Sequence, residues 1–355
     1  MREKIFILLT LLALVVVPIG LTPGVNAQDG PTYSVAVSIA PLGGIVKRVG
    51  GGSVDVVVIL PEGVEPHASQ LPTEAVTAAQ NADLLVFTGH FPWEESLAQQ
   101  VEKPFLSLEQ PDAIENYTDY GARLSPLPGD VELGDEHEEH EDEGNPHGYW
   151  LLPTNALAIG NATRVALSSL DGELSDFFES NFELFSADVA AFENLIETMN
   201  DDYQFMDLNA ITVFPAEAYV AEAFGIETVA YLQEGDIQIS GSDLLQVQDA
   251  LRNGSVSLIL GSDVARLQAA GEFALQLVED YGGTLVWWRA LFFEGLADYL
   301  AVMTYNLGAL TSALDYRGGT GTNPAFLVLF AGLAGVFGLV AVLEGVVIYR
   351  REKGE

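Results

Sequence analysis

Short apolar runs rich in β-branched residues alternate with amphipathic stretches through most of the chain. Apolar runs bounded by Gly, Pro or Asn are typical of buried strands, and the stretches between them show helical spacing. The predicted strands are residues 33–39, 54–60, 83–88, 210–214, 228–232, 256–260 and 284–288. The predicted helices are residues 73–82, 216–224, 243–253, 264–281 and 296–314. This alternation predicts parallel sheets covered by helices.

A long stretch with near-helical apolar spacing separates two such groups of strands. It covers residues 155–204 and predicts one long helix, with Asp171-Gly172 as a candidate break. The predicted fold class is therefore α/β: two α/β lobes with parallel-type sheets, residues 28–154 and 205–316, joined by one long rigid helix. Two such lobes leave a cleft between them, and ligands bind there outside the carboxyl ends of the strands.

Apolar segments at the two ends of the chain predict its location. Residues 1–27 have a basic start, a short apolar core and small residues at the end, which is typical of a cleaved signal peptide. An uncleaved N-terminal anchor is the alternative. From residue 325 onward 19 residues carry no charge, so residues 325–349 are predicted to form a transmembrane helix followed by a basic cytoplasmic tail, residues 350–355. We expect the body at the cell surface, held close to the membrane by a short linker, residues 317–324.

The composition is strongly acidic and lacks cysteine. The 51 Asp and Glu residues outnumber the 14 Lys and Arg residues, which gives a formal net charge of −37. Such a surface repels nucleic acid, so nucleic acid is excluded as a partner, and it attracts cations. Adaptation to salty surroundings explains the size of the charge better than cation binding does, but it does not explain the clustering of the histidines. The absence of cysteine excludes disulfides and thiolate metal ligands.

The histidines are unevenly distributed, because none lies in the second half of the chain. The five histidines are His67, His90, His137, His140 and His147. The last three lie in a segment so acidic, residues 132–147, that we expect a solvated loop. Imidazole and carboxylate groups together favour borderline divalent cations such as Zn²⁺ and Mn²⁺. We interpret His137 and His140 as an auxiliary metal-collecting loop, with simple solvated charge as the alternative.

Several motifs in fixed order resemble one protein family. They are PEGVEPH at residues 61–67, ADLLVFTG at 82–89 followed by Trp93-Glu94, NPHGYWLLP at 145–153 and YLAVMTYNL at 299–307. In this order and spacing they resemble the zinc- and manganese-binding solute-binding proteins of ABC transporters, over nearly the whole predicted body. The resemblance implies two α/β lobes bridged by one long helix, with a metal ion in the cleft.

The resemblance also implies metal ligands, of which only two are retained. His67 and His147 match the first two ligands of the family. The third, a His or Glu at the end of a strand, is replaced by Phe214. The fourth, an Asp in a turn near the last strand, is replaced by Arg289. These two replacements count against the coordination by both lobes that the family uses.

Two explanations remain for these replacements. In the first, His90 joins His67 and His147 to form a first-lobe site with an open fourth position, because it follows a predicted strand at the same sheet edge. Glu217, three positions after Phe214, is a weaker candidate ligand from the second lobe. In the second, metal binding is lost, and Arg289 binds a small anionic solute.

Three functions follow from these alternatives. The first is a membrane-tethered, monomeric binding protein that captures Zn²⁺ or Mn²⁺ and delivers it to an ABC-transporter permease; its affinity should fall below roughly pH 6.5 as imidazoles are protonated. The second is the same scaffold binding an anion through Arg289. The third is a zinc hydrolase, since an open position on zinc can activate water. The sequence contains no recognisable catalytic motif, so we do not expect an enzyme.

Overall fold

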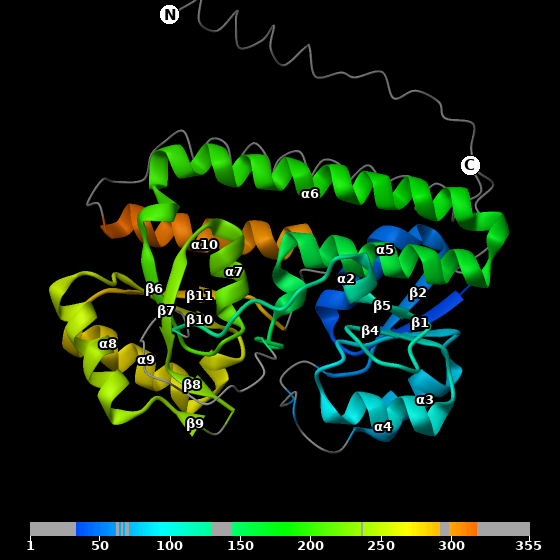
Figure 1. Cartoon of the computed structure of the whole chain (residues 1–355), viewed down its shortest axis with the longest axis horizontal. Coiled ribbons are helices and arrows are strands. Elements are labelled where there is room, and N and C mark those ends of the chain that lie inside the picture. The colour runs from blue at the N-terminus through cyan, green and yellow to red at the C-terminus, as the bar shows by residue number, and fades with distance from the viewer. Residues whose placement is uncertain are drawn as a thin grey trace, which may run out of the picture.

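The computed structural model describes residues 33–61, 64, 67, 71–129, 144–235, 237–291 and 298–317 (Figure 1). It confirms an α/β fold with two parallel sheets and a long helix. The first lobe holds a sheet in the order β2-β1-β3-β4-β5, with all neighbours parallel. Its strands are β1 (Tyr33–Val37), β2 (Val54–Val58), β3 (Leu84–Val86), β4 (Phe105–Ser107) and β5 (Glu115–Asn116).

Helices cover both faces of this sheet. On one side lies α2 (Ala40–Gly50), and on the other lie α3 (Thr73–Asn81) and α4 (Pro92–Val101) (Figure 1). The centre of the sheet is apolar on both faces, because β3 is buried throughout its length. A strand buried on both faces reads as a continuous apolar run, which is why the pattern around residues 83–88 predicted a strand.

The second lobe repeats the architecture with a sheet in the order β11-β10-β6-β7, again parallel throughout. Its strands are β6 (Asn209–Thr212), β7 (Glu227–Tyr231), β10 (Leu258–Ser262) and β11 (Thr284–Trp288). Its helices are α7 (Glu217–Phe224), α8 (Gly241–Asn253), α9 (Ala269–Tyr281) and α10 (Tyr299–Arg317). A small antiparallel hairpin, β8 (Gln233–Glu234) with β9 (Ile237–Gln238), follows β7 at the cleft side.

The helical stretch predicted over residues 155–204 is divided into two helices at its candidate break, Asp171-Gly172, so it is not one continuous helix. The first is α5 (Pro153–Leu170) and the second is α6 (Ser175–Tyr203). The break occurs where Asp171 takes an extended backbone conformation and its Oδ1 accepts a hydrogen bond of 2.9 Å from the Glu173 N–H. Asp side chains that bond nearby backbone groups compete with helix in this way. The chain reverses, and α6 runs across both lobes (Figure 1).

The α6 helix unites the lobes through a shared core. Its 29 residues extend about 44 Å, and its buried residues belong to one apolar cluster with residues of both sheets. A separate cluster fills the space between the second sheet and α8 and α9. The lobes therefore rest on a common rigid base, and the carboxyl ends of their strands border the same cleft.

The predicted signal peptide, residues 1–27, lies outside the described residues, as do the transmembrane anchor, residues 325–349, and the tail, residues 350–355. None of the helices that are described combines the length and the apolar character needed to cross a membrane.

Candidate metal centre

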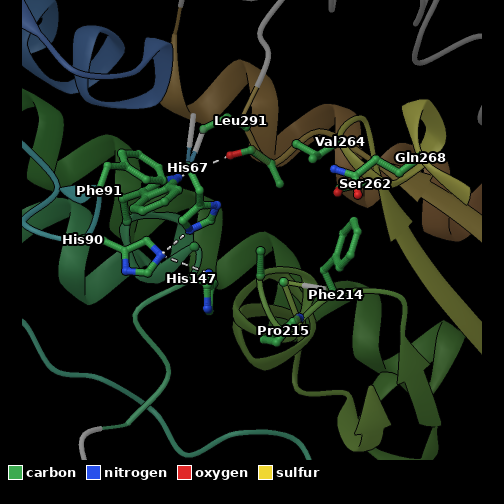
Figure 2. A pocket seen from close by; sticks show the side chains of 15 residues that line it. His67, His90, Phe91, His147, Phe214, Pro215, Ser262, Val264, Gln268 and Leu291 are labelled. Atoms are coloured by element: carbon green, nitrogen blue, oxygen red, sulfur yellow. Dashed lines mark hydrogen bonds between the residues drawn. The ribbon is translucent and has the colours of Figure 1, made fainter. Parts of the chain in front are cut away.

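Three imidazoles from the first lobe converge at the mouth of the cleft (Figure 2). His67 follows β2, His90 follows β3, and His147 precedes α5. The Nε2 atom of His90 lies 3.0 Å from Nε2 of His67 and 3.1 Å from Nδ1 of His147. The rings of His67 and His147 are 5.7 Å apart between centroids. One nitrogen from each ring falls within 4.8 Å of the other two, so a single ion can contact all three.

A buried carboxylate holds the turn that carries His90. Glu94, on α4, is only 2% exposed. Its oxygens accept hydrogen bonds from the backbone N–H groups of Thr88 (2.8 Å), His90 (3.1 Å) and Phe91 (3.2 Å). Burial raises the pKa of this carboxyl, and the hydrogen bonds from Thr88 and Phe91 oppose that shift. Because one carboxylate accepts hydrogen bonds from three backbone N–H groups, the backbone of the turn that carries His90 is held in place.

His147 is positioned by contacts that cross between the lobes. The buried Asn145 accepts a hydrogen bond of 3.0 Å from the His147 N–H through Oδ1 and donates one of 2.9 Å from Nδ2 to the Pro215 carbonyl. Gly148, with φ of +84°, lets the backbone of this segment lie close to Ala216 of the second lobe. A Cβ at this position would lie 2.8 Å from the Ala216 carbonyl oxygen. This segment therefore needs glycine both for its backbone angle and for its space.

Burial keeps the imidazoles ready to act as ligands. The pKa of His90 is lowered to about 3, first by burial and then by the neighbouring His147 and His67. The pKa of His147 is lowered to about 4, by burial and then by His67. Both rings are therefore neutral at neutral pH. A neutral imidazole has a free lone pair, which is the form that binds a metal ion.

The second lobe faces the histidines with a mostly apolar wall. The cavity between them measures about 360 Å³. On the second-lobe side its lining consists of Phe214, Pro215, Ala216, Gly235, Ser262, Val264, Gln268, Ala290 and Leu291. Figure 2 shows Phe214 projecting into the space opposite the three rings. Among the described residues of this wall, only Ser262 and Gln268 have side-chain oxygens, and neither carries a charge.

The two other predicted site residues lie away from the imidazoles. Glu217 is fully buried beneath the cavity wall, where its Oε2 accepts a hydrogen bond of 2.8 Å from the Phe214 N–H. Burial raises the pKa of Glu217 to about 8, although a hydrogen bond from Ser262 lowers it. Arg289 places its guanidinium 5.8 Å from the centre of the Tyr305 ring, and it is not among the described residues that line the cavity. The structure therefore brings neither residue to the histidine cluster.

One acidic residue near the cluster was missed by the sequence reasoning. Glu234 in β8 places Oε1 3.8 Å from Nε2 of His147, across the cleft. The available signal was its position just after β7, because the residues after parallel strands meet at one sheet edge. His137 and His140, predicted as an auxiliary loop, lie outside the described residues.

The chain belongs to the family of the periplasmic component A of the zinc-uptake complex, ZnuA, whose model matches residues 35–313. This confirms the resemblance inferred from the motifs. The zinc-binding lipoprotein AdcA of Streptococcus pneumoniae (strain ATCC BAA-255 / R6) is 24% identical over 303 residues, which cover 82% of this chain and 58% of AdcA. The chain thus matches only about three fifths of that relative.

Two further comparisons agree with this family. The manganese-binding lipoprotein MntA of Halalkalibacterium halodurans is 25% identical over 207 residues, or 58% of this chain and 62% of MntA. The crystal structure of the Streptococcus pneumoniae AdcAII protein superimposes with a TM-score of 0.62 at 19% identity and covers 81% of this chain and 100% of that one. At this identity the superposition shows a shared fold.

Proposed function

We propose that this chain is an extracytoplasmic solute-binding protein that captures a divalent metal ion for uptake by an ABC transporter. The observation that supports it best is the convergence of His67, His90 and His147 on one point in the cleft. Membership of the zinc-uptake family supports the same role, as do relatives named as zinc-binding and manganese-binding lipoproteins. The proposal assigns the chain capture and delivery of the ion, and no reaction.

The ligand set favours Zn²⁺ over Mn²⁺. Imidazole suits zinc, whereas manganese prefers carboxylate, carbonyl and water oxygens. Three nitrogens around tetrahedral zinc at about 2.0–2.1 Å lie roughly 3.4 Å apart, and the two contacts of His90 are 3.0 and 3.1 Å. A small outward movement of the rings therefore admits the ion. The fourth position faces the apolar second lobe and is left for water or another small ligand.

The membrane tether and the transport partner belong to this proposal as well. An apolar C-terminal helix over residues 325–349 would hold the body beside the membrane, where an ABC-transporter permease could receive the ion. The apolar run and the basic end support this helix, and relatives named as lipoproteins support membrane attachment in general. The proposed protein acts as a monomer.

Calorimetric titration of the purified chain with Zn²⁺ tests the proposed function. We expect high-affinity binding by the natural chain and its loss in the double variant His67→Ala, His147→Ala, because two of three nitrogens are removed. A double variant that titrates like the natural chain would overturn the proposal. The variant His137→Ala, His140→Ala is the matched control, since it removes two imidazoles but none from the cleft.

A further inference from the structure

Glu234 is the acidic side chain of the second lobe that approaches the histidine cluster. Its Oε1 lies 3.8 Å from Nε2 of His147, and both side chains are largely shielded, with 34% and 20% of their surfaces exposed. The separation is within ion-pair range but is longer than a hydrogen bond by roughly 1 Å. The contact joins β8 of the second lobe to the segment before α5 of the first.

The two nitrogens of the His147 ring face different partners. Its Nδ1 faces His90 at 3.1 Å, on the side of the candidate metal position. Its Nε2 faces Glu234. Because the two nitrogens of an imidazole point away from each other, a carboxylate at Nε2 does not reach an ion held by Nδ1. Glu234 is therefore placed to orient the ring, and not to bind the same ion directly.

We propose that Glu234 is a positioning residue that accepts a hydrogen bond from His147 Nε2–H, aims Nδ1 at the metal ion, and draws the β8–β9 hairpin onto the first lobe when the ion binds. This inference rests on the proposed function. A proton fixed on Nε2 leaves the Nδ1 lone pair free. Histidine ligands commonly donate their other N–H to a carboxylate, which fixes the tautomer and strengthens the ligand.

The hairpin is built in a way that permits the required movement. It consists of two residue pairs, Gln233 with Gln238 and Glu234 with Ile237. A hairpin this short is marginally stable by itself. Its base is attached to the sheet, because the Gln233 N–H donates a hydrogen bond of 3.0 Å to the Val213 carbonyl. Glu234 can thus move the remaining distance of roughly 1 Å toward His147 while Gln233 keeps its hydrogen bond to the sheet.

A second contact orients the Glu234 carboxylate. Its Oε2 accepts a hydrogen bond of 3.2 Å from the Tyr231 hydroxyl, so that Oε1 is the oxygen turned toward His147. Coupling between two sites is reciprocal. If the ion strengthens the bond from His147 to Glu234, then Glu234 must strengthen binding of the ion by the same factor.

The test compares the full chain with the variants Glu234→Ala and Glu234→Gln, and with Glu227→Gln as a charge-matched control on the exposed part of β7. We expect Glu234→Ala to weaken Zn²⁺ binding in calorimetry by about 10–100-fold, the usual loss when such a partner is removed. Glu234→Gln should lose less, because an amide oxygen still accepts the bond. Glu227→Gln should bind as the natural chain does. Equal affinity in all four proteins would overturn the inference.

Two further readouts separate this inference from the proposed function. In the metal-free chain the Glu234 carboxylate, 3.8 Å from Nε2, already attracts a proton to that nitrogen before the ion draws the two groups together. We therefore expect ¹⁵N NMR of the five histidines to show the proton of His147 on Nε2 in the natural protein and a mixture of tautomers in Glu234→Ala. This measurement needs no metal, so it tests the contact between Glu234 and His147 even if the natural chain fails to bind Zn²⁺. Identical signals in both proteins would contradict the inference.

Hydrogen exchange should show zinc-dependent protection of residues 233–239 in the natural chain only. Equal protection in Glu234→Ala would also contradict the inference.

Discussion

At the scale of single residues, the candidate site combines two positions that the family resemblance marks with one further histidine. His67 and His147 occupy the positions that the family resemblance marked, whereas Phe214 and Arg289 replace its other two ligands. His90 stands where its Nε2 meets both retained rings, at 3.0 and 3.1 Å. The structure thus moves the candidate coordination from both lobes to the first lobe alone.

The neutral state of the buried rings changes the expected pH dependence. If two ligand imidazoles had ordinary pKa values near 6.5, their protonation would lower the metal affinity about a hundredfold at pH 5.5. The pKa values of about 3 for His90 and about 4 for His147 place their protonation well below that pH. We therefore expect these two ligands to retain Zn²⁺ at pH 5.5, in contrast to the loss below pH 6.5 that the sequence alone suggested.

The same lowered pKa values fix the sign of what His90 and His147 contribute to the stability of the metal-free chain. Between pH 6.5 and about 4 the unfolded chain binds protons that these two residues do not bind when folded, so their contribution to stability falls as the pH falls, whereas the raised pKa of Glu217 acts in the opposite direction. Zinc titrations at pH 7.0 and 5.5, with thermal unfolding of the metal-free chain alongside, check both points. A hundredfold loss of affinity at pH 5.5 would show that the rings titrate normally.

The sequence predicted which residues meet at the site only where their position at the edge of a sheet brings them together. His67 and His90 follow β2 and β3, two parallel strands of one sheet with β1 between them, so their position at a common sheet edge followed from the apolar runs before them. The direction of the Arg289 side chain did not, because it depends on Tyr305 in a helix that packs beside it. The approach of Glu234 to His147 depends on how the lobes meet, and no local pattern records that.

At the scale of elements, the boundary between α5 and α6 determines which helix links the lobes. Apolar spacing continues through Leu170, Leu174 and Phe177, so periodicity alone predicts one helix. The break depends on two hydrogen bonds that the Asp171 carboxylate accepts, one from the Glu173 N–H and one from the Tyr33 hydroxyl. The second partner is 138 positions away, and such a contact cannot be read from local sequence. Strands as short as β4 and β5 were also missed, because they offer too few residues to show a pattern.

The turn between His147 and α5 provides a test at this scale. The substitution Gly148→Ala places a Cβ 2.8 Å from the Ala216 carbonyl oxygen at a φ of +84°. We expect a stability loss above the roughly 1–2 kcal/mol that the left-handed conformation alone imposes on a non-glycine residue, together with weaker Zn²⁺ binding because His147 shifts. Urea unfolding and calorimetry measure the two effects.

The control for this variant is Gly121→Ala. Gly121 also has a positive φ, +95°, but a Cβ there meets no atom within 4 Å. It should therefore lose only the backbone contribution and bind Zn²⁺ normally. If the two variants behave alike in both measurements, the close approach of the lobes at Gly148 does not position His147.

At the scale of the whole molecule, the proposed function assigns one architecture to both stability and capture of the ion. The α6 helix packs against both lobes in a common core, which holds the two sheet edges opposite each other. A net charge of −37 raises the concentration of cations around the molecule, while the neutral imidazoles supply the selective ligands. The lobes and their parallel sheets were predictable from the alternation of strands and helices; the way in which they close was not.

X-ray absorption at the zinc edge of the zinc-loaded chain tests the central claim most directly, because it counts the ligands of the ion. We predict three imidazole nitrogens at about 2.0–2.1 Å, the usual Zn–N distance, and one further light ligand in the natural chain. In His90→Gln the count should fall to two imidazoles. A natural chain with fewer than two imidazoles on zinc, or a spectrum that His90→Gln leaves unchanged, would contradict coordination by the three histidines of the first lobe.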